Sequence, residues 1–273
     1  SLEYFPPRTE KGAQGLAAAR AELKLLKPSY VSVTFGAGGS TQDGTYATIK
    51  SILEEDGVDA APHISCISSS RRELADMLEA YRDLGVKRLV ALRGDVPSGY
   101  GTMDAAELRY ANELVAFIRE QTGDHFRIEV AAYPETHPQA RSAQDDLDNF
   151  KRKVDAGANS AITQYFFNPD AYYAFMDSCS KLGLDIPVIP GIMPITNYKQ
   201  LARFSDTCGA EIPRWIRKRL EGYGDDLASI REFGFDVVLG LCEKLLDGGA
   251  PGLHFYSMNR TEPTRALWKA LDL

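Results

Sequence analysis

Short apolar runs alternate with longer amphipathic segments along the whole chain. The runs are continuously apolar, as in residues 31–33 and 89–92, and do not alternate with polar positions. This pattern is typical of parallel strands whose sheet is buried on both faces. We predict strands at residues 2–5, 30–34, 60–64, 89–92, 126–132, 160–164, 187–191 and 252–256.

The segments between these runs repeat apolar residues at spacings of three and four, which predicts helices. Ser70 and Glu73 have the spacing of a capping box at one helix start, and Gly85 is a stop signal after it. The predicted helices cover residues of about 11–26, 41–55, 70–84, 104–121, 142–156, 169–182, 197–207, 213–222, 225–247 and 262–271.

Strand and helix thus alternate eight times with short connections. Eight such units in 273 residues predict an α/β fold, a single (β/α)8 barrel of the TIM type that forms one domain over 1–273. An open, doubly wound sheet is the alternative. In a barrel, the residues that follow each strand converge on one face, where catalytic groups gather.

Composition and charge narrow the class of protein. The chain is 44% hydrophobic and 25% charged, as ordinary globular proteins are, and its net charge of −7 argues against nucleic-acid binding. No apolar run is long enough for a membrane span and no signal peptide is visible. Four scattered cysteines without a metal-ligand spacing predict free thiols in the cytoplasm and no metal site.

Polar and aromatic side chains follow most of the predicted strands, which favours an active site over a set of solvated turns. They are Glu3, Thr34, His63, Arg93, Asp95, Tyr133, His137, Gln164, Phe166, Tyr256 and Arg260.

Two carboxyl groups are the first candidates for catalysis. Glu3 is flanked by Leu2 and Tyr4, and burial there would raise the pKa of its carboxyl and suit a general acid. The alternative is an exposed glutamate on a frayed terminal segment. Asp95 is close to Arg93 and should stay ionised, either for catalysis or as a structural ion pair.

Other candidate features have weaker signals. The glycine-rich stretch 36–39 precedes a helix and could cradle phosphate, but it lacks the lysine of a Walker A loop, and a tight turn is the simpler interpretation. No histidine has a serine or cysteine partner in a nucleophile motif. The aromatic run 165–167 could stack on a flat ligand or belong to the core.

Eight motifs, in order along nearly the whole chain, resemble the methylenetetrahydrofolate reductase family in its bacterial, catalytic-domain-only form. They lie at residues 3–8 (EYFPPR), 34–41 (TFGAGGST), 92–95 (LRGD), 132–138 (AYPETHP), 151–158 (KRKVDAGA), 162–167 (ITQYFF), 190–194 (PGIMP) and 254–260 (HFYSMNR).

The resemblance implies an FAD-containing barrel that reduces 5,10-methylenetetrahydrofolate to 5-methyltetrahydrofolate. NADH or NADPH would reduce the flavin and leave, and the folate would then use the same site, which is a ping-pong scheme. Members of this family serve one-carbon metabolism and methionine biosynthesis, although a catabolic pathway could run the reaction in reverse. They often associate, so a homo-oligomer is compatible with the resemblance.

The resemblance also implies roles for individual residues. Glu3 matches the general acid that protonates N10 of the folate, and Asp95 matches the acid beside flavin and pterin. Substrate contacts match Gln164, Gln200, Phe204, Tyr256 and Arg260. FAD contacts match Thr34, His63, Arg93, Gly94, Asp95, Tyr110, Ala111, Ala131, Tyr133, His137, Asp146, Asn149, Arg152 and Lys153, with Ala158 as packing support.

Some alternatives stay open at this point. Another FAD barrel of the proline dehydrogenase type, or a flavin-free phosphate-binding barrel, would share the same architecture. No role follows for residues 97–102 or 211–226.

Overall fold

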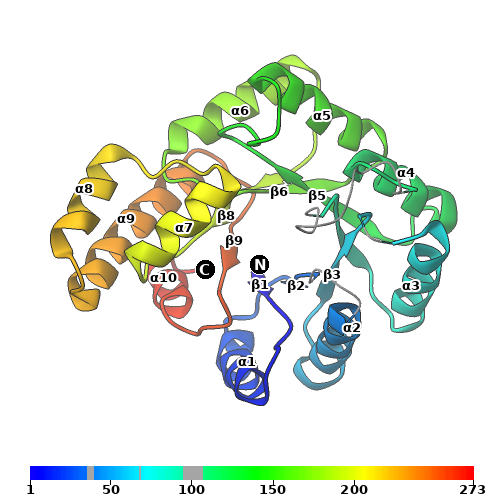
Figure 1. Cartoon of the computed structure of the whole chain (residues 1–273), viewed down its shortest axis with the longest axis horizontal. Helices are drawn as coiled ribbons and strands as arrows, with labels where there is room; N and C mark the ends of the chain where they lie inside the picture. The colour runs from blue at the N-terminus through cyan, green and yellow to red at the C-terminus, as the bar shows by residue number, and fades with distance from the viewer. Residues whose placement is uncertain (36–39, 68, 95–106) are drawn as a thin grey trace.

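Nine parallel strands form a nearly closed barrel with helices around it in a computed structural model of the chain (Figure 1). The structure describes residues 1–35, 40–67, 69–94 and 107–273. The strands follow each other around the sheet in the order β7-β6-β5-β4-β3-β2-β1-β9-β8. They are β1 (Leu2–Tyr4), β2 (Val31–Val33), β3 (Ala60–Ser65), β4 (Arg88–Leu92), β5 (Arg127–Ala132), β6 (Ser160–Thr163), β7 (Val188–Ile189), β8 (Gly191–Ile192) and β9 (His254–Tyr256).

The barrel prediction is confirmed, with one difference in the seventh strand. Pro190 divides the predicted strand 187–191 into β7, which pairs with β6, and β8, which pairs with β9. Proline has no N–H to donate to a neighbouring strand, so the ladder is interrupted there. The Pro190 carbonyl oxygen still accepts a bond of 2.9 Å from the His254 N–H. Pro190 therefore links β7 to β8, and the barrel continues from β6 to β9 through this one residue.

Helices connect successive strands and cover the outside of the barrel (Figure 1). They are α1 (Glu10–Leu23), α2 (Ser40–Ser51), α3 (Arg71–Asp83), α4 (Ala111–Thr122), α5 (Ala143–Asp155), α6 (Pro169–Lys181), α7 (Tyr198–Cys208), α8 (Arg214–Tyr223), α9 (Leu227–Asp247) and α10 (Thr264–Ala270). A 3-10 turn (Lys24–Leu26) extends α1 and a π-helical turn (Ile52–Asp56) extends α2.

The ends of two helices show how well local signals predicted them. The capping box at Ser70 is present, because its side chain accepts from the Glu73 N–H and Glu73 accepts from the Ser70 N–H. The predicted start of the fourth helix at about residue 104 is wrong for the described residues 107–110. There the chain is not helical, and α4 begins at Ala111 after an extended Tyr110.

Hydrophobic side chains fill both the shell between strands and helices and the inside of the barrel. Inside, Tyr30, Ala61, Val90 and Ile162 form a small separate cluster. Phe166, only 1% exposed, belongs to the larger cluster outside, as do its two aromatic neighbours. The run 165–167 is therefore core.

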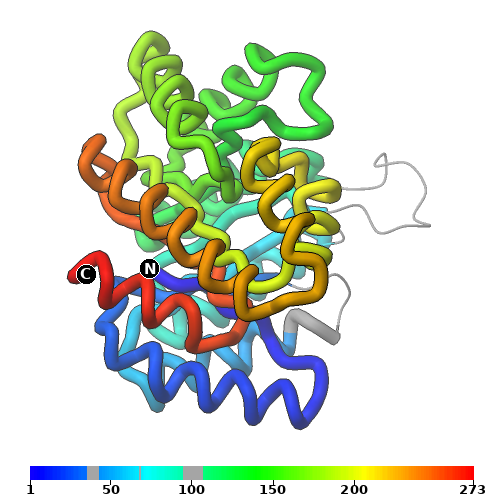
Figure 2. Tube along the Cα trace, turned by 90° about the vertical axis from the view of Figure 1, so that its left-hand side faces the viewer, coloured from blue at the N-terminus to red at the C-terminus, as the bar shows by residue number. Residues whose placement is uncertain are grey.

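The two ends of the chain lie at the same end of the molecule (Figure 2). The Phe255 N–H donates to the Ser1 carbonyl oxygen at 3.0 Å, so the first residue lies beside β9. Among the helices of the described residues, none has the length and apolarity that crossing a membrane requires. Those same residues contain no group of three or more His, Cys, Asp and Glu side chains placed to hold a metal ion.

Candidate active site

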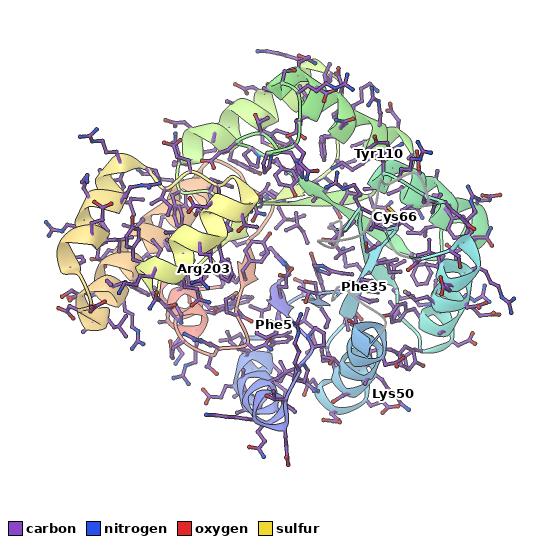
Figure 3. All side chains as sticks on the ribbon, in the orientation of Figure 1. Phe5, Phe35, Lys50, Cys66, Tyr110 and Arg203 are labelled. Atoms are coloured by element: carbon purple, nitrogen blue, oxygen red, sulfur yellow. The ribbon has the colours of Figure 1, made fainter. Side chains whose placement is uncertain are left out.

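The carboxyl ends of the strands bring the predicted site residues to one mouth of the barrel. Glu3 on β1 pairs in register with Ser32 on β2 and with Tyr256 on β9. In Figure 3, Phe5 marks the exit of β1 and Tyr110 marks the start of α4. Two groups of side chains lie at this mouth, one around Glu3 and one above β4 and β5.

The Glu3 carboxylate is surrounded by two imidazoles and a hydroxyl. Its Oε2 atom lies 3.3 Å from Nε2 of His63 and 3.6 Å from Nε2 of His254. The Ser32 hydroxyl donates to the same oxygen at 3.4 Å. The Glu3 side chain is 19% exposed, so part of it can still be reached from the barrel mouth.

The expected rise in the pKa of Glu3 is wrong for this structure. Burial does raise that pKa, but the two imidazoles outweigh burial and lower it from 4.5 to about 2. Burial lowers the pKa of His254, which is 0% exposed, while Glu3 opposes that shift. The carboxylate and the imidazoles are thus coupled, and a proton that enters the cluster belongs to the group as a whole.

His254 is a site residue that the sequence analysis missed. Its Nδ1 atom lies 2.9 Å from the Ser1 hydroxyl oxygen, and its ring contacts Tyr256 edge-on with centroids 5.4 Å apart. The available signal was the period of two in a strand, which places residues 254 and 256 on the same face. Among the described residues, the buried Nε2 atoms of His63 and His254 have no hydrogen bond of good geometry, and each faces the Glu3 carboxylate instead.

The backbone that carries Glu3 is held from the loop after β9. The Ser257 hydroxyl donates to the Glu3 carbonyl oxygen at 2.5 Å. The Asn259 amide accepts from the Phe5 N–H at 3.0 Å and donates to the Phe5 carbonyl at 2.8 Å. Asn259 has a positive φ of 54°, an uncommon conformation that brings its side chain to β1.

Several predicted substrate residues line the same mouth. Gln164 follows β6 and is half-buried. The Tyr256 hydroxyl donates to the Thr163 carbonyl at 2.7 Å, and burial raises the pKa of Tyr256 well above its usual range. Arg260 is exposed and, with Thr34, lines a cavity of about 580 Å³ beside the β1 exit.

Helix α7 carries the other two predicted substrate residues. Gln200 is exposed in its first turn, and Phe204 is half-buried one turn later. The neighbouring Ser205 hydroxyl lies 3.0 Å from the Tyr165 hydroxyl, which fixes α7 beside the exit of β6. The structure therefore brings both residues to the side of the mouth where Gln164 lies.

Arg93 and Gly94 begin the second group, at the end of β4. The Arg93 carbonyl accepts from the Ser65 hydroxyl at 2.8 Å and from the Ile67 N–H at 3.0 Å, which joins the exits of β3 and β4. Gly94 has a φ of 87°, and a Cβ there would lie 1.9 Å from the Ser65 hydroxyl oxygen. Asp95, the predicted partner of flavin and folate, lies outside the described residues, as does the glycine-rich stretch 36–39.

The loop after β5 and helix α5 complete this group. The rings of Tyr133 and His137 contact edge-on with centroids 4.5 Å apart. The Asp146 carboxylate accepts from the His137 N–H at 2.8 Å, and so joins α5 to the loop. The Asn149 side chain accepts from Arg152 at 2.6 Å on the same helix.

Lys153 brings a buried positive charge to this region. Its ammonium group donates to the Ala131 carbonyl at 2.6 Å and forms no ion pair with any described carboxylate. Burial lowers the pKa of Lys153 from 10.5 to about 8, although the Asp146 charge opposes the shift. A buried ammonium without a counter-ion is suited to a phosphate group. Arg93 and Arg152 are the further predicted cations that could complete a donor set for a pyrophosphate.

The remaining predicted cofactor residues lie at the edge of this group. Tyr110 is 51% exposed at the start of α4, and Ala111 follows it half-buried. Ala158 is buried after α5, next to Gly157, whose carbonyl accepts from the Arg119 guanidinium at 2.7 Å. Ala158 belongs to the hydrophobic core, and its role as packing support for a cofactor stays a prediction.

Comparisons with known proteins show the family of this chain. The family model for methylenetetrahydrofolate reductase matches residues 1–272. The 5,10-methylenetetrahydrofolate reductase of Salmonella typhimurium is 43% identical over 273 residues, which are 100% of this chain and 90% of that protein. The enzyme of the same name from Escherichia coli is 42% identical, with the same coverage.

A solved structure shows the same fold at low sequence identity. It is an uncharacterized protein from Clostridium thermocellum that binds two copies of 5-methyl-5,6,7,8-tetrahydrofolic acid. The two chains have a TM-score of 0.66 and 17% identity, over 99% of this chain and 94% of that one. On the full-length sequence match, this chain belongs to the methylenetetrahydrofolate reductase family.

Proposed function

We propose that this chain reduces 5,10-methylenetetrahydrofolate to 5-methyltetrahydrofolate with FAD as its cofactor and NADH or NADPH as its reductant. Family membership carries the folate reaction. The cofactor, the reductant and the residue roles rest on the arrangement of side chains at the barrel mouth. The observation that carries most of the proposal is the Glu3 carboxylate between His63 and His254.

The folate reaction needs a proton at a defined place. The five-membered ring of the substrate must open to an iminium cation at N5 before its carbon can be reduced, and opening requires a proton at N10. Glu3, His63 and His254 form a partly shielded acid–base cluster that can hold such a proton. Since the Glu3 side chain is the most exposed of the three, at 19% against 9% for His63 and 0% for His254, we assign it as the residue that hands the proton to N10.

The low pKa of Glu3 changes where that proton is stored. A carboxyl with a pKa of about 2 is ionised at neutral pH. Glu3 would therefore have to gain its proton during turnover, and an adjoining imidazole is the group that could relay it as the ring opens. A substrate that displaces water from the mouth would disfavour the charged carboxylate and favour the neutral carboxyl.

The second group at the mouth fits FAD. When bound there, FAD would pass reducing equivalents from the nicotinamide to the folate. Arg93, Arg152 and Lys153 would hold the pyrophosphate, and Asp146 would accept from a ribose hydroxyl. Asp95 remains the expected anion beside flavin and pterin, and its role stays a prediction.

The substrate side of the mouth fits a pterin and its tail. Gln164 can donate to and accept from a pterin edge with the same amide, and Phe204 offers a ring face. Thr34 and Arg260 line the adjoining cavity. One mouth of this kind would bind nicotinamide and folate in turn, which is the ping-pong order.

A visible spectrum followed by two anaerobic half-reactions tests this proposal. The purified protein should show flavin bands between roughly 370 and 450 nm. NADH or NADPH should bleach those bands, and methylenetetrahydrofolate should then restore them. A colourless protein without affinity for added FAD, or bleached flavin that the folate does not reoxidise, would contradict the proposal.

A further inference from the structure

A second buried carboxylate lies inside the barrel, away from the mouth. Glu129 on β5 is 0% exposed, and its two carboxylate oxygens have different partners. The Tyr30 hydroxyl donates to one at 2.6 Å, and the Arg88 guanidinium donates to the other at 2.5 Å. Barrel interiors are usually filled by aliphatic layers, and a buried ion pair adds little stability over apolar packing. Stability alone therefore does not account for the Glu129–Arg88 pair.

The ion pair holds a tyrosine ring from two sides. While Glu129 fixes the Tyr30 hydroxyl, the Arg88 guanidinium lies over the Tyr30 ring at 4.3 Å from its centroid. Tyr30 also contacts the active site, because its ring stacks on the His254 ring with centroids 6.3 Å apart and planes 26° apart. Arg88, Glu129, Tyr30 and His254 thus form a continuous column to Glu3.

We propose that Glu129 is a positioning residue that, together with Arg88 and Tyr30, orients the His254 imidazole and sets how readily it holds a proton for Glu3. The electrostatic part of this role needs no direct contact between Glu129 and His254. The Glu129 carboxylate favours the protonated imidazole, and Arg88 limits that effect. In its consequence for catalysis, the inference rests on the proposed function of Glu3.

Several charged or titratable groups lie around His254 and can each affect how readily its imidazole binds a proton. They are Glu3 on β1 with Ser1 just before it, Tyr30 just before β2, His63 on β3, Arg88 on β4, Glu129 on β5 and Tyr256 on β9. Among these groups, Glu3 and Glu129 are the anions that favour a protonated His254.

Two substitutions at the column should shift the titration of His254 in opposite directions. Glu129→Gln keeps the shape of the side chain but removes the anion and leaves Arg88 unpaired, so the midpoint should move to lower pH. Arg88→Gln leaves the anion unpaired, so the midpoint should move to higher pH. A purely structural role would shift both variants in the same direction or in neither.

Histidine NMR measures this midpoint without reference to catalysis. The chain has four histidines, so protein labelled with ¹³C at histidine Cε1 gives four signals, which single His→Gln variants assign. We expect the His254 midpoint to lie at the lowest pH in Glu129→Gln, at an intermediate pH in the wild type and at the highest pH in Arg88→Gln, with steps of about 0.5–1 pH unit. If the wild-type signal does not titrate above the acid unfolding transition, Arg88→Gln should bring it into range.

The matched control is Ser160→Ala. Ser160 is the neighbour of Glu129 across the β5–β6 ladder, is buried, and has a hydroxyl without a partner among the described residues. The titration midpoint of His254 in Ser160→Ala should equal that of the wild type. Equal midpoints in Glu129→Gln, Arg88→Gln and wild type, or no His254 titration in any of them, would overturn the inference.

The kinetic consequence separates this inference from the proposed function. In Glu129→Gln, folate-dependent reoxidation at pH 7.5 should slow by about 3- to 10-fold and its pH profile should move with the NMR midpoint. Reduction by NADH should stay within about twofold. A wild type without any folate-dependent step would refute the proposed function, yet the NMR order would still decide the role of Glu129. Shifted NMR midpoints with an unmoved pH profile would overturn the link to Glu3.

Discussion

His63 Nε2 lies 3.3 Å from Glu3 Oε2, so an imidazole from β3 and a carboxylate from β1 meet across β2 at the barrel mouth. His254 adds a second imidazole to the same oxygen. Burial alone would raise the pKa of Glu3 and keep its carboxyl protonated more readily, whereas the two imidazoles lower that pKa and keep the carboxylate ionised. The proton donor of this site is therefore the cluster as a whole and not Glu3 alone.

Stability should fall on the acid side because of this cluster. The pKa of His254 is lowered by burial, so the unfolded chain binds more protons below pH 6.5 and acid favours unfolding. The pKa of Glu3 falls from 4.5 to about 2, so its contribution to stability is complete above pH 4.5 and is lost as the pH falls toward 2. Urea unfolding from pH 4 to 8 should show decreasing stability below pH 6.5, with a smaller slope in His254→Asn. Equal slopes in both proteins would contradict a neutral, buried His254.

Lys153 should lower the stability of the flavin-free protein and strengthen the binding of FAD. Its ammonium group is forced into a buried place, which lowers its pKa from 10.5 to about 8 and destabilises the protein below pH 8. In flavin-free protein at pH 7, Lys153→Met should therefore be more stable by about 1–2 kcal/mol, after loss of the bond to the Ala131 carbonyl.

The same variant should bind FAD at least about tenfold more weakly, because a buried charge for the pyrophosphate is gone. Stability of the wild type should rise between pH 8 and 10.5, and that rise should disappear in Lys153→Met. Lys151→Met is the control, since Lys151 lies on the same helix but pairs with Asp155 at the surface. A Lys153→Met protein that binds FAD as tightly as this control would contradict the assignment.

A side chain at Gly94 should be destabilising because it would clash with Ser65, and Gly85 is the comparison that separates this clash from backbone strain. Both glycines have nearly the same positive φ, 87° and 86°, but a Cβ at Gly85 would meet nothing within 4 Å. Both alanine variants should lose about 1 kcal/mol from backbone strain. Gly94→Ala should lose a further ~1–3 kcal/mol, because its Cβ would overlap the Ser65 hydroxyl and part the exits of β3 and β4.

Thermal unfolding and retained flavin measure this difference. Gly94→Ala should release flavin on purification, while Gly85→Ala should keep it. Equal unfolding temperatures for the two variants would show that the close approach at Ser65 is unimportant.

The sequence predicted the architecture well where the signals were local. Apolar runs, spacing of helical positions and stop glycines placed most strands and helices within a few residues of their observed bounds. The split at Pro190 and the late start of α4 were missed, because both depend on which neighbour a segment pairs or packs with. A proline in an apolar run was nevertheless a visible warning.

The predicted convergence of strand ends places Glu3 beside Tyr256, and the cofactor candidates around α5 lie together. The roles of these residues stay predictions, and the direction of the Glu3 pKa shift was not predicted. Nothing local in the sequence shows that residues 63 and 254, so distant along the chain, approach the same oxygen of Glu3. The sign of its pKa shift follows from that approach and so required the structure. The buried Glu129–Arg88 pair is of the same kind, a contact between two strands that composition does not reveal.

The most direct measurement is stopped-flow analysis of the two half-reactions in wild type and Glu3→Gln. The glutamine keeps the shape of the side chain but cannot pass a proton to N10, so flavin reduction by NADH or NADPH should stay within a few fold of wild type. Reoxidation by methylenetetrahydrofolate should slow by at least about 100-fold, the usual contribution of a general acid. Glu54→Gln, at an exposed position, serves as the control. Equal losses in both half-reactions, or a Glu3→Gln protein that reoxidises at the wild-type rate, would contradict the role of Glu3 in this account.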